Sequence, residues 1–494
     1  MSTQPKAIVI GAGFAGLSAA TCLAHHGWKV TILEKNNQAG GRARRLSRQG
    51  FHFDMGPSWY WMPDVFERYF RRFGKRVEDY YTLQRLDPSY RVVFGKEEQV
   101  DIPARIEDFK ALCESYEPGS SRRLEQFLQE AAYKYEVGVG KLVYKPSLSI
   151  REFIDPKLLV DMLRMQALQS FHKHVRKFFK HPKLIELMEF PILFLGATPK
   201  NTPALYSLMN YADVALGTWY PMGGMYSVVE GMLRLAQEQG VEVVYGAEVE
   251  KIDVQAGKAH SVHTAAQSYA ADVVIAGADY HHVEAALLEP AYRQYSEAYW
   301  QKRTMAPSAL LYYLGVSKKI KNLRHHVLFF DEDFEQHAHD IYTQPQWPRE
   351  PLFYLSASSI TDPQAAPAGK ENLVLLIPIA AGLNDTPAIR ARYFEQIMKQ
   401  LEYYTGESIR PFIEVHESYA GSDFIRDYHA FKGNAYGLAN TLKQTAIFRP
   451  RIKSKKVSNL YFTGQLTVPG PGVPPALISG QVVADYIRAQ FEKN

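Results

Sequence analysis

The chain has 494 residues, more than a single hydrophobic core usually organises, so we expect two or three subdomains. Hydrophobic residues make up 46% and charged residues 22% of the chain, which is typical of a globular protein and excludes a disordered or fibrous one. The net charge of +5 is too weak to indicate a nucleic-acid-binding protein, and the two cysteines, Cys22 and Cys113, exclude a disulfide framework.

An apolar, strand-like run at residues 7–10 begins close to the N-terminus. It leaves no room for the apolar region and cleavage site of a signal peptide. No stretch reaches the roughly 18 apolar residues that cross a bilayer, the nearest being residues 190–196. We therefore expect a cytoplasmic protein whose contact with the inner face of the cell membrane is peripheral.

The sequence GAGFAG connects this first run to residues 15–23, which have helical spacing. A G-x-G-x-x-G sequence between a strand and a helix is the fingerprint of a dinucleotide-binding turn. Gly11 permits the tight turn, Gly13 lets backbone amides approach a pyrophosphate, and Gly16 allows the helix to pack closely on the strand. The N-terminus of the helix then faces the phosphates.

A second predicted strand, residues 30–33, is followed by Glu34, about 20 residues after the glycine turn. A carboxylate at this separation hydrogen-bonds ribose hydroxyls and argues against a 2′-phosphate. NAD and FAD share this fold, so the fingerprint alone does not choose between them.

Two segments that follow, AGGRARR and GFHFDMGPSWY, resemble the extension with which flavoproteins continue along their cofactor. The resemblance places Gly41 and Arg42 by the pyrophosphate, and Gly56, Pro57 and Ser58 toward the flavin. FAD is therefore the expected cofactor.

Further segments resemble the phytoene desaturase family of FAD-dependent carotenoid desaturases, which shares its fold with amine oxidases. They lie at residues 194–211, 219–252, 359–379, 431–450 and 459–487, and so extend along almost the whole chain. The last of them is similar to the closing flavin motif of that family, with a strand, a Gly/Pro loop and a helix whose N-terminus faces the flavin ring.

Residues 219–252 by themselves predict a glycine turn, an amphipathic helix and a strand, and residues 271–279 predict a further buried strand of the same sheet. The cofactor-binding residues implied by the fingerprint and the resemblance are Gly11, Ala12, Gly13, Phe14, Ala15, Gly16, Glu34, Lys35, Gly41, Arg42, Gly56, Pro57, Ser58, Val249, Gly464, Gly472, Val473 and Pro474. The chain departs from many relatives at Val468, where they have a His, and at Gln465 and Leu466, where they have an Ala-Gly pair. These departures leave the identity of the substrate open.

The predicted fold class is α/β. We expect a Rossmann-like FAD-binding domain of the amine oxidase/carotenoid desaturase type, with an inserted α+β substrate domain and a helical membrane-facing subdomain. The predicted boundaries are 1–90, 216–290 and 451–494 for the FAD-binding domain, 91–140 and 291–450 for the substrate-binding domain, and 141–215 for the helical, membrane-associating insertion.

Basic and apolar side chains interleave in residues 169–189, QSFHKHVRKFFKHPKLIELME. An apolar stripe with basic flanks is typical of a helix that lies in an anionic headgroup layer, and a substrate that dissolves only in the bilayer favours this interpretation. A surface helix with a solvated basic face is the alternative. The histidines show no carboxylate or cysteine pattern, so no metal site is predicted.

The resemblance implies an oxidoreductase acting on CH–CH groups, with a hydrophobic carotenoid as substrate. The main prediction is a phytoene desaturase of carotenoid biosynthesis, which converts phytoene stepwise towards lycopene with flavin as hydride acceptor and oxygen or a quinone as the final oxidant. Arg151 and Glu152 are the predicted catalytic pair, because relatives carry an Arg followed by a carboxylate there. A surface charge pair at the start of a helix is the alternative for these two residues.

Four alternatives for the function stay open. Two of them, a hydroxycarotenoid 3,4-desaturase and a carotenoid isomerase, belong to the same family. The third is an amine oxidase-like flavoenzyme, and the fourth is a flavin-binding module without catalysis.

Overall fold

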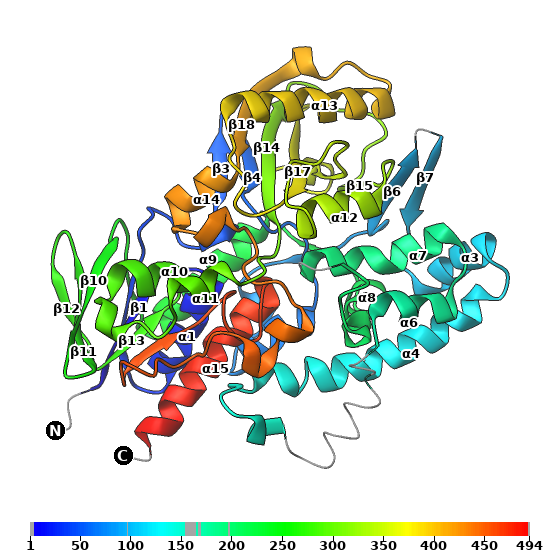
Figure 1. The fold of residues 1–494 in the computed structure, drawn as a ribbon. Helices are drawn as coiled ribbons and strands as arrows, with labels where there is room; N and C mark the ends of the chain where they lie inside the picture. Colours follow the sequence, from blue (N-terminus) through cyan, green and yellow to red (C-terminus); the bar gives the residue numbers. More distant parts are fainter. Residues whose placement is uncertain (1–3, 96, 154–164, 166–168, 196–197, 493–494) are drawn as a thin grey trace.

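The computed structural model describes residues 4–95, 97–153, 165, 169–195 and 198–492. Two lobes, each built on a β-sheet, lie one above the other, and a group of helices lies beside them (Figure 1). Parts of the predicted helical insertion, residues 154–164, 166–168 and 196–197, lie outside the described residues.

A five-stranded parallel sheet forms the lower lobe, with strand order β19-β13-β1-β2-β9. Its strands are β1 (Lys6–Ile10), β2 (Lys29–Leu33), β9 (Glu242–Val244), β13 (Val273–Ala276) and β19 (Leu460–Phe462). Three distant parts of the chain thus share one sheet. This arrangement is Rossmann-like, as the sequence predicted.

Side chains of this sheet alternate between two covered faces. Ala7 and Val9 share a core with helices, whereas Ile8 and Ile10 share a core with a small antiparallel sheet. The helices are α1 (Phe14–His25), α9 (Met225–Glu238) and α15 (Val473–Phe491), and the small sheet consists of β10 (Val249–Gln255), β11 (Lys258–Thr264) and β12 (Ser268–Ala270). Burial on both faces explains why these strands appear in the sequence as continuous apolar runs.

The upper lobe contains a seven-stranded sheet with strand order β18-β14-β17-β16-β15-β6-β7. All neighbours are antiparallel except β15 and β6. Its strands are β6 (Tyr90–Gly95), β7 (Glu98–Ile102), β14 (Ser308–Val316), β15 (His326–Phe329), β16 (Phe353–Ser356), β17 (Glu371–Ile379) and β18 (Ile413–Tyr419). Helix α13 (Pro387–Thr405) covers one face, and Phe51 and Phe53 of the hairpin β3 (Arg45–Arg48) and β4 (Phe51–Asp54) pack on the other.

A group of helices lies beside the two lobes (Figure 1). It contains α3 (Ile106–Tyr116), α4 (Ser120–Gly138), α6 (Phe171–Phe178), α7 (Pro182–Glu189) and α8 (Leu208–Asn210). Helix α4 packs against α3, α6 and α8, although residues 91–140 were assigned to the substrate domain. An amphipathic pattern shows that a helix has an apolar face but does not show which partner covers it, and the predicted domain boundaries stay a prediction.

The segment 169–189 does not form a single helix with an apolar stripe on its surface, so that part of the prediction is wrong, whereas peripheral contact with a membrane stays a prediction. Two short helices, α6 and α7, form there, and Pro182 starts the second of them. Its apolar side chains pack inside the protein; those buried are Phe171, Val175, Phe179, Leu184 and Leu187. The exposed side chains include Lys173, Lys177 and Lys180.

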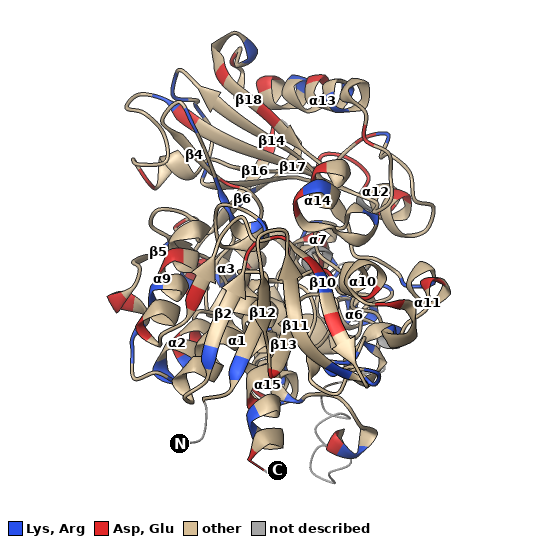
Figure 2. Cartoon of the chain, turned by 90° about the vertical axis from the view of Figure 1, so that its left-hand side faces the viewer, with Lys and Arg blue, Asp and Glu red and all other residues tan. Residues whose placement is uncertain are grey.

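Shorter elements connect these parts. They include α2 (Pro63–Arg71), β5 (Leu83–Arg85), β8 (Trp219–Pro221), α10 (Tyr280–His282), α11 (Glu297–Gln301), α12 (Phe334–Tyr342) and α14 (Gly421–Tyr428). Among the described helices there is none whose length and hydropathy would let it span a bilayer. Charges of both signs are scattered over the outer helices and loops (Figure 2).

Candidate active site

The turn between β1 and α1 shows what each glycine does. Gly11 has a φ of 95°, in the region that favours glycine. A Cβ atom on Gly16 would lie 2.0 Å from the carbonyl oxygen of Gly11, so Gly16 is needed for the helix to approach the strand. A Cβ atom on Gly13 would meet only the Cα atom of Gly41, at 4.0 Å. Gly13 therefore keeps space open above the turn.

Glu34, directly after β2, reaches back to this turn. Its side chain is buried, its Oε2 atom accepts a 2.7 Å hydrogen bond from the backbone N–H of Ala12, and its Oε1 atom accepts one of 2.8 Å from the N–H of Asn36. Two backbone donors thus fix the carboxylate at the edge of the groove described next. A carboxylate in this position suits the ribose hydroxyls of a dinucleotide.

A groove of about 270 Å³ runs from Glu34 past the glycine turn to the N-terminus of α15. Most of the predicted cofactor-binding residues line it: Gly11, Gly13, Phe14, Ala15, Glu34, Lys35, Gly41, Arg42, Gly56, Pro57, Val249, Gly464, Gly472 and Val473. Ser58 and Pro474 line a neighbouring cavity instead. Ala12 lies in the turn itself and Gly16 in the first turn of α1, and neither lines the groove.

Arg42 offers an anion-binding group to this groove. Its Nη2 atom donates to the carbonyl oxygen of Asn434 at 3.2 Å, and its guanidinium lies 5.1 Å from the centre of the Tyr428 ring. Its Nε atom is buried and has no partner among the described residues. Burial lowers the pKa of Arg42, while the charge of Asp279 opposes this shift. An unpaired N–H beside the glycine turn fits a pyrophosphate, so these residues suit FAD.

Several groove residues were missed by the sequence analysis, because they lie on segments that carry no recognised cofactor motif. They are Asp279, His282, Asp427, Tyr428, His429 and Tyr436. The rings of His282 and His429 stack with centroids 3.9 Å apart, and burial lowers the pKa of His282 to about 4. The position of Asp279, just after a strand of the parallel sheet, is the one signal that the sequence held, because ligands bind beyond the carboxyl ends of such strands.

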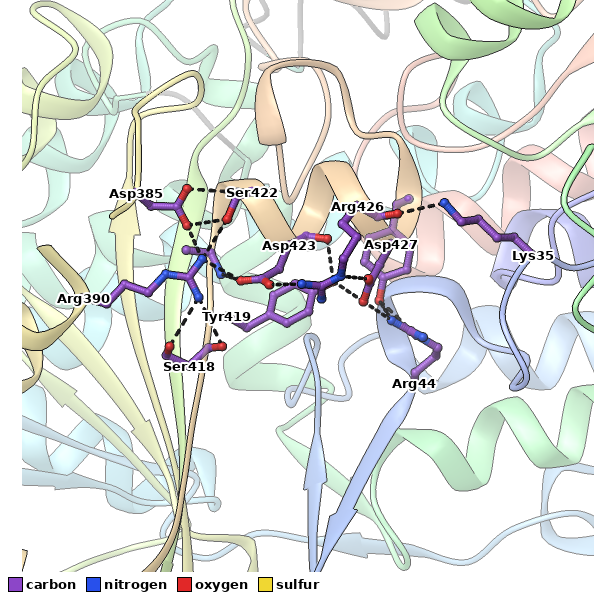
Figure 3. Close-up of polar contacts among 12 residues, drawn as sticks. Lys35, Arg44, Asp385, Arg390, Ser418, Tyr419, Ser422, Asp423, Arg426 and Asp427 are labelled. Carbon is purple, nitrogen blue, oxygen red and sulfur yellow. Dashed lines mark hydrogen bonds and ion pairs between the residues drawn. The ribbon is translucent and has the colours of Figure 1, made fainter. Parts of the chain in front are cut away.

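Helix α14 belongs to the upper lobe but closes one side of the groove, and Figure 3 shows the polar contacts that hold it. Arg44 Nη2 lies 2.7 Å from Asp427 Oδ2 and donates to the hydroxyl of Tyr428 at 3.1 Å. Lys35 Nζ donates to the carbonyl oxygen of Arg426 at 2.8 Å. Lys35 and Arg44 both lie in the segment between β2 and β3, so these contacts connect α14 to that segment.

At its other end, the same helix is held within the upper lobe. Arg390 of α13 lies 2.7 Å from Asp423 and also pairs with Asp385 (Figure 3). Helix α14 is therefore connected to both lobes and forms part of the wall of the groove.

An apolar cavity of about 220 Å³ adjoins the groove. The two share Gly56, Pro57, Leu376, Tyr436, Gly472 and Val473 as a common wall. The rest of the cavity is lined mainly by aromatic and aliphatic side chains, among them Trp59, Trp61, Phe190, Phe330, Ile341 and Phe353. No Asp, Glu, Lys or Arg occurs among the described residues that line it. Such a wall suits a hydrocarbon chain with one end at the groove.

A few polar side chains do line this cavity. The Oγ atom of Ser58 lies 2.8 Å from the hydroxyl of Tyr354, which lies 2.6 Å from His326 Nδ1. His337 uses both ring nitrogens, since Nδ1 accepts from the backbone N–H of Leu352 and Nε2 lies 2.9 Å from a carbonyl oxygen. No three His, Cys, Asp or Glu side chains gather as metal ligands within the part of the chain that is described.

Arg151 and Glu152 lie away from both cavities. Arg151 is exposed, and the carboxylate of Glu152 accepts hydrogen bonds of 2.8 to 2.9 Å from the backbone N–H groups of Ser147, Leu148 and Ser149. Neither residue is part of the groove or cavity wall. Their catalytic role stays a prediction, and the observed contacts of Glu152 serve its own loop.

Comparison with known proteins agrees with this geometry. The sequence model of the protein family described as flavin-containing amine oxidoreductases matches residues 14–488. The chain is 43% identical to a carotenoid 3,4-desaturase of Haloarcula japonica, with 97% of each chain covered. It is 34% identical to a zeta-carotene-forming phytoene desaturase of Myxococcus xanthus, with 98% of this chain and 94% of the other covered.

A solved structure of an oxidoreductase from Methanosarcina mazei has the same fold. Its TM-score is 0.61 at 16% identity, with 97% of this chain and 100% of that chain covered. The likeness confirms the predicted fold class and carries no information on the substrate.

Proposed function

Since this chain belongs to the FAD-dependent carotenoid desaturases, within the family of flavin-containing amine oxidoreductases, we propose that it desaturates a carotenoid at the 3,4 position. The observation that carries the proposal is the 43% identity to a carotenoid 3,4-desaturase over nearly the whole of both chains. Identity to a phytoene desaturase is lower, at 34%. The alternative of a 3,4-desaturase is therefore better supported than the main prediction of a phytoene desaturase, and a hydroxylated carotenoid is the first substrate to test.

FAD supplies the hydride acceptor that no side chain provides. Glu34 is placed for the ribose and Arg42 for the pyrophosphate, while the space over Gly13 lets the cofactor lie against the backbone. The shared wall at Gly56 and Gly472 would bring the end of the carotenoid up to the reactive ring of the cofactor. The protein's contribution is thus to orient two large molecules against each other.

The aromatic lining of the cavity excludes water from the reacting carbons. Water would otherwise trap the cation that develops as hydride leaves the polyene, so exclusion protects the reaction. Oxygen or a quinone is proposed as the final oxidant. Peripheral contact with the inner face of the cell membrane is also proposed, because the substrate dissolves in the bilayer.

Anaerobic mixing of the FAD-loaded protein with single carotenoids tests the proposal. A hydroxylated carotenoid with a saturated 3,4 bond should bleach the flavin absorbance without NAD, and the polyene spectrum should shift to longer wavelength. Phytoene should reduce the flavin at least about tenfold more slowly, a difference of about 1.4 kcal/mol in activation free energy. Faster reduction by phytoene would restore the main prediction, and reduction only by a simple amine would contradict both.

A further inference from the structure

Desaturation removes a proton as well as a hydride, and the apolar cavity offers few groups that accept a proton. None of the described lining residues is a carboxylate or a lysine. His337 is the lining imidazole, but a backbone N–H already occupies Nδ1 and a carbonyl oxygen faces Nε2. A proton on Nδ1 would break its bond to Leu352 and leave that buried N–H unpaired.

A second imidazole, His326, is reached through two hydroxyl groups. Ser58 and Tyr354 line the cavity, and the distances from Ser58 Oγ to Tyr354 Oη and from there to His326 Nδ1 are 2.8 and 2.6 Å. All three side chains are buried, with His326 fully so. The chain of hydroxyls therefore leads from the cavity wall into the interior and ends on a ring nitrogen.

The direction of these hydrogen bonds follows from their chemistry. A phenol donates well to a neutral imidazole nitrogen, so Tyr354 donates to Nδ1 and its oxygen accepts from Ser58. The lone pairs of Ser58 are then left facing the cavity. In this arrangement the proton of the imidazole is on Nε2, which is buried and has no partner among the described residues, and Nδ1 accepts the hydrogen bond of Tyr354 along which a second proton can arrive.

The surroundings keep His326 neutral in the resting protein, and one ring contact reduces the cost of charging it. Burial lowers the pKa of His326 well below its ordinary value, and neighbouring His325, which is hydrogen-bonded to Thr361 at 2.7 Å, adds to that shift. The ring stacks on Trp59 with centroids 4.3 Å apart and an interplanar angle of 8°. An indole face stabilises a cation, so Trp59 would offset part of the cost of charging the imidazole.

We infer that Ser58, Tyr354 and His326 form the proton relay of the desaturation. The inference rests on the proposed function. One C–H bond of the substrate breaks with loss of hydride to FAD, and the neighbouring C–H bond breaks with loss of a proton to Ser58 Oγ. The proton of Ser58 passes to Tyr354 Oη, and that of Tyr354 passes to His326 Nδ1. The electron pair of the second C–H bond becomes the new double bond.

The hydrogens balance. The substrate loses two, of which one leaves as hydride and one is held on His326 until the product has left, when the relay runs backward and Ser58 releases the proton into the emptied cavity. The oxygen or quinone that reoxidises the cofactor takes up both electrons and the equivalent of both hydrogens. Ser58 contacts the substrate and is the catalytic residue of the relay, whereas His326 acts through Tyr354.

His326→Asn tests the relay in the FAD-loaded protein. An Asn side chain offers Tyr354 an acceptor oxygen in place of Nδ1 but is not protonated. We expect flavin reduction by the carotenoid to slow by about 100-fold, within the range that general-base catalysis contributes. FAD affinity and the unfolding temperature should stay close to those of the wild type. In His326→Ala, added imidazole should restore part of the rate of flavin reduction. Ser58→Ala should slow flavin reduction as His326→Asn does, whereas Ser58→Thr, which keeps a hydroxyl group, should retain the wild-type rate.

A spectroscopic readout is independent of turnover. In protein labelled with ¹⁵N-histidine, the resonances absent from His326→Asn identify His326. They should show a neutral ring protonated on Nε2, with Nδ1 accepting a hydrogen bond that Tyr354→Phe removes. A ring protonated on Nδ1 would reverse the chain and overturn the relay.

The outcomes separate the two proposals. A wild-type protein whose flavin no carotenoid reduces contradicts the proposed function, and the relay falls with it. A wild-type protein that is reduced, together with an equally fast His326→Asn, overturns the relay alone. If His326→Asn does not load FAD, the Ser58→Ala and Ser58→Thr pair decides in its place, and equal rates for that pair overturn the relay.

Discussion

Gly13 and Gly16 of the glycine fingerprint have different roles. The atoms that an added Cβ would contact at each position distinguish the two. Gly16 is needed by the protein itself, because a Cβ atom there would collide with the backbone of Gly11. Gly13 has an extended conformation that other residues adopt, with φ −75° and ψ 176°, and has room for a small side chain. Its requirement for glycine therefore comes from the ligand.

We expect Gly13→Val to lose FAD and to keep the fold. The added methyl groups would occupy the space where the pyrophosphate meets the backbone, so the purified protein should lack the flavin spectrum. Its unfolding temperature should equal that of wild-type protein stripped of FAD. Gly16→Ala is the control, and it should unfold at a lower temperature than the stripped wild type. A Gly13→Val protein with full flavin occupancy would contradict this assignment.

Tyr342 shows a buried polar group without a partner. It lines the apolar cavity, and its hydroxyl oxygen is buried and makes no hydrogen bond to the described residues. Removing such a group should stabilise the protein by ~1 kcal/mol, so Tyr342→Phe should raise the unfolding temperature of the FAD-loaded protein. Tyr354→Phe is the matched control and should lower it, because Ser58 and His326 would each lose a partner. Equal shifts of the same sign in both variants would contradict the prediction.

The sequence allowed prediction of those site residues whose interaction partners are backbone groups or residues close in sequence. The glycine turn and Glu34 could be predicted, because the spacing between strands fixes their geometry. Ser58 was predicted to approach the flavin, but its bond to Tyr354 joins residues that are 296 positions apart. No spacing rule links positions so far apart, and for that reason the relay was not visible in the sequence.

At the scale of elements, a sequence pattern identifies an apolar face but not the partner that covers it, and this explains which helices and strands were predicted correctly and which were not. Strands that form continuous apolar runs, such as β1 and β13, and a helix with helical spacing of its apolar residues, α1, were predicted from the sequence pattern, whereas α15 was predicted from the family resemblance. The stripe on α6 and α7 was also recognised, but its partner was taken to be lipid and is instead the protein core. Periodicity reports that a face is apolar, whereas the identity of its partner depends on tertiary packing.

Helix α14 provides the test at this scale, because polar contacts hold it over the groove. The Arg44 side chain is 12% exposed and pairs with Asp427, so we expect Arg44→Ala to weaken FAD binding by at least about tenfold. Arg426→Ala is the matched control. The Arg426 side chain is 64% exposed, belongs to α14 and, among the described residues, forms ion pairs only within that helix, with Asp423 and Asp427. Its loss should therefore change FAD affinity by less than about threefold. Flavin fluorescence during titration measures both, and equal effects would contradict a role of α14 in holding FAD.

In the whole molecule, the cofactor groove and the apolar cavity meet between the two lobes. The parallel sheet supplies the glycine turn and Glu34, and the upper lobe supplies Tyr354 and α14 (Figure 1). The helices α4, α6, α7 and α8 extend the core that lies beside the cavity, with Phe190 and Met209 among the lining residues.

Lys173 and Lys177 on α6 and Lys180 in the link to α7 are exposed, and we propose that they provide the peripheral contact with an anionic membrane surface. Because the apolar stripe is buried, attachment there should be electrostatic and without insertion. We expect the protein to sediment with anionic liposomes at low salt and to be released as salt rises. Reversing Lys173, Lys177 and Lys180 to Glu should lower partitioning by at least about 100-fold, since each lysine near an anionic surface contributes about 1 kcal/mol.

A control with the same change in net charge separates a specific surface from general attraction. Lys251, Lys258 and Lys302 are exposed on β10, β11 and the segment after α11, on the other side of the molecule in Figure 1. Their reversal to Glu should leave most of the binding intact, because screening confines the interaction to charges within about 10 Å of the surface at 0.1 M salt. Equal release by both triple variants would show that only net charge matters, and no sedimentation of the wild type at low salt would contradict the membrane-facing role of α6 and α7.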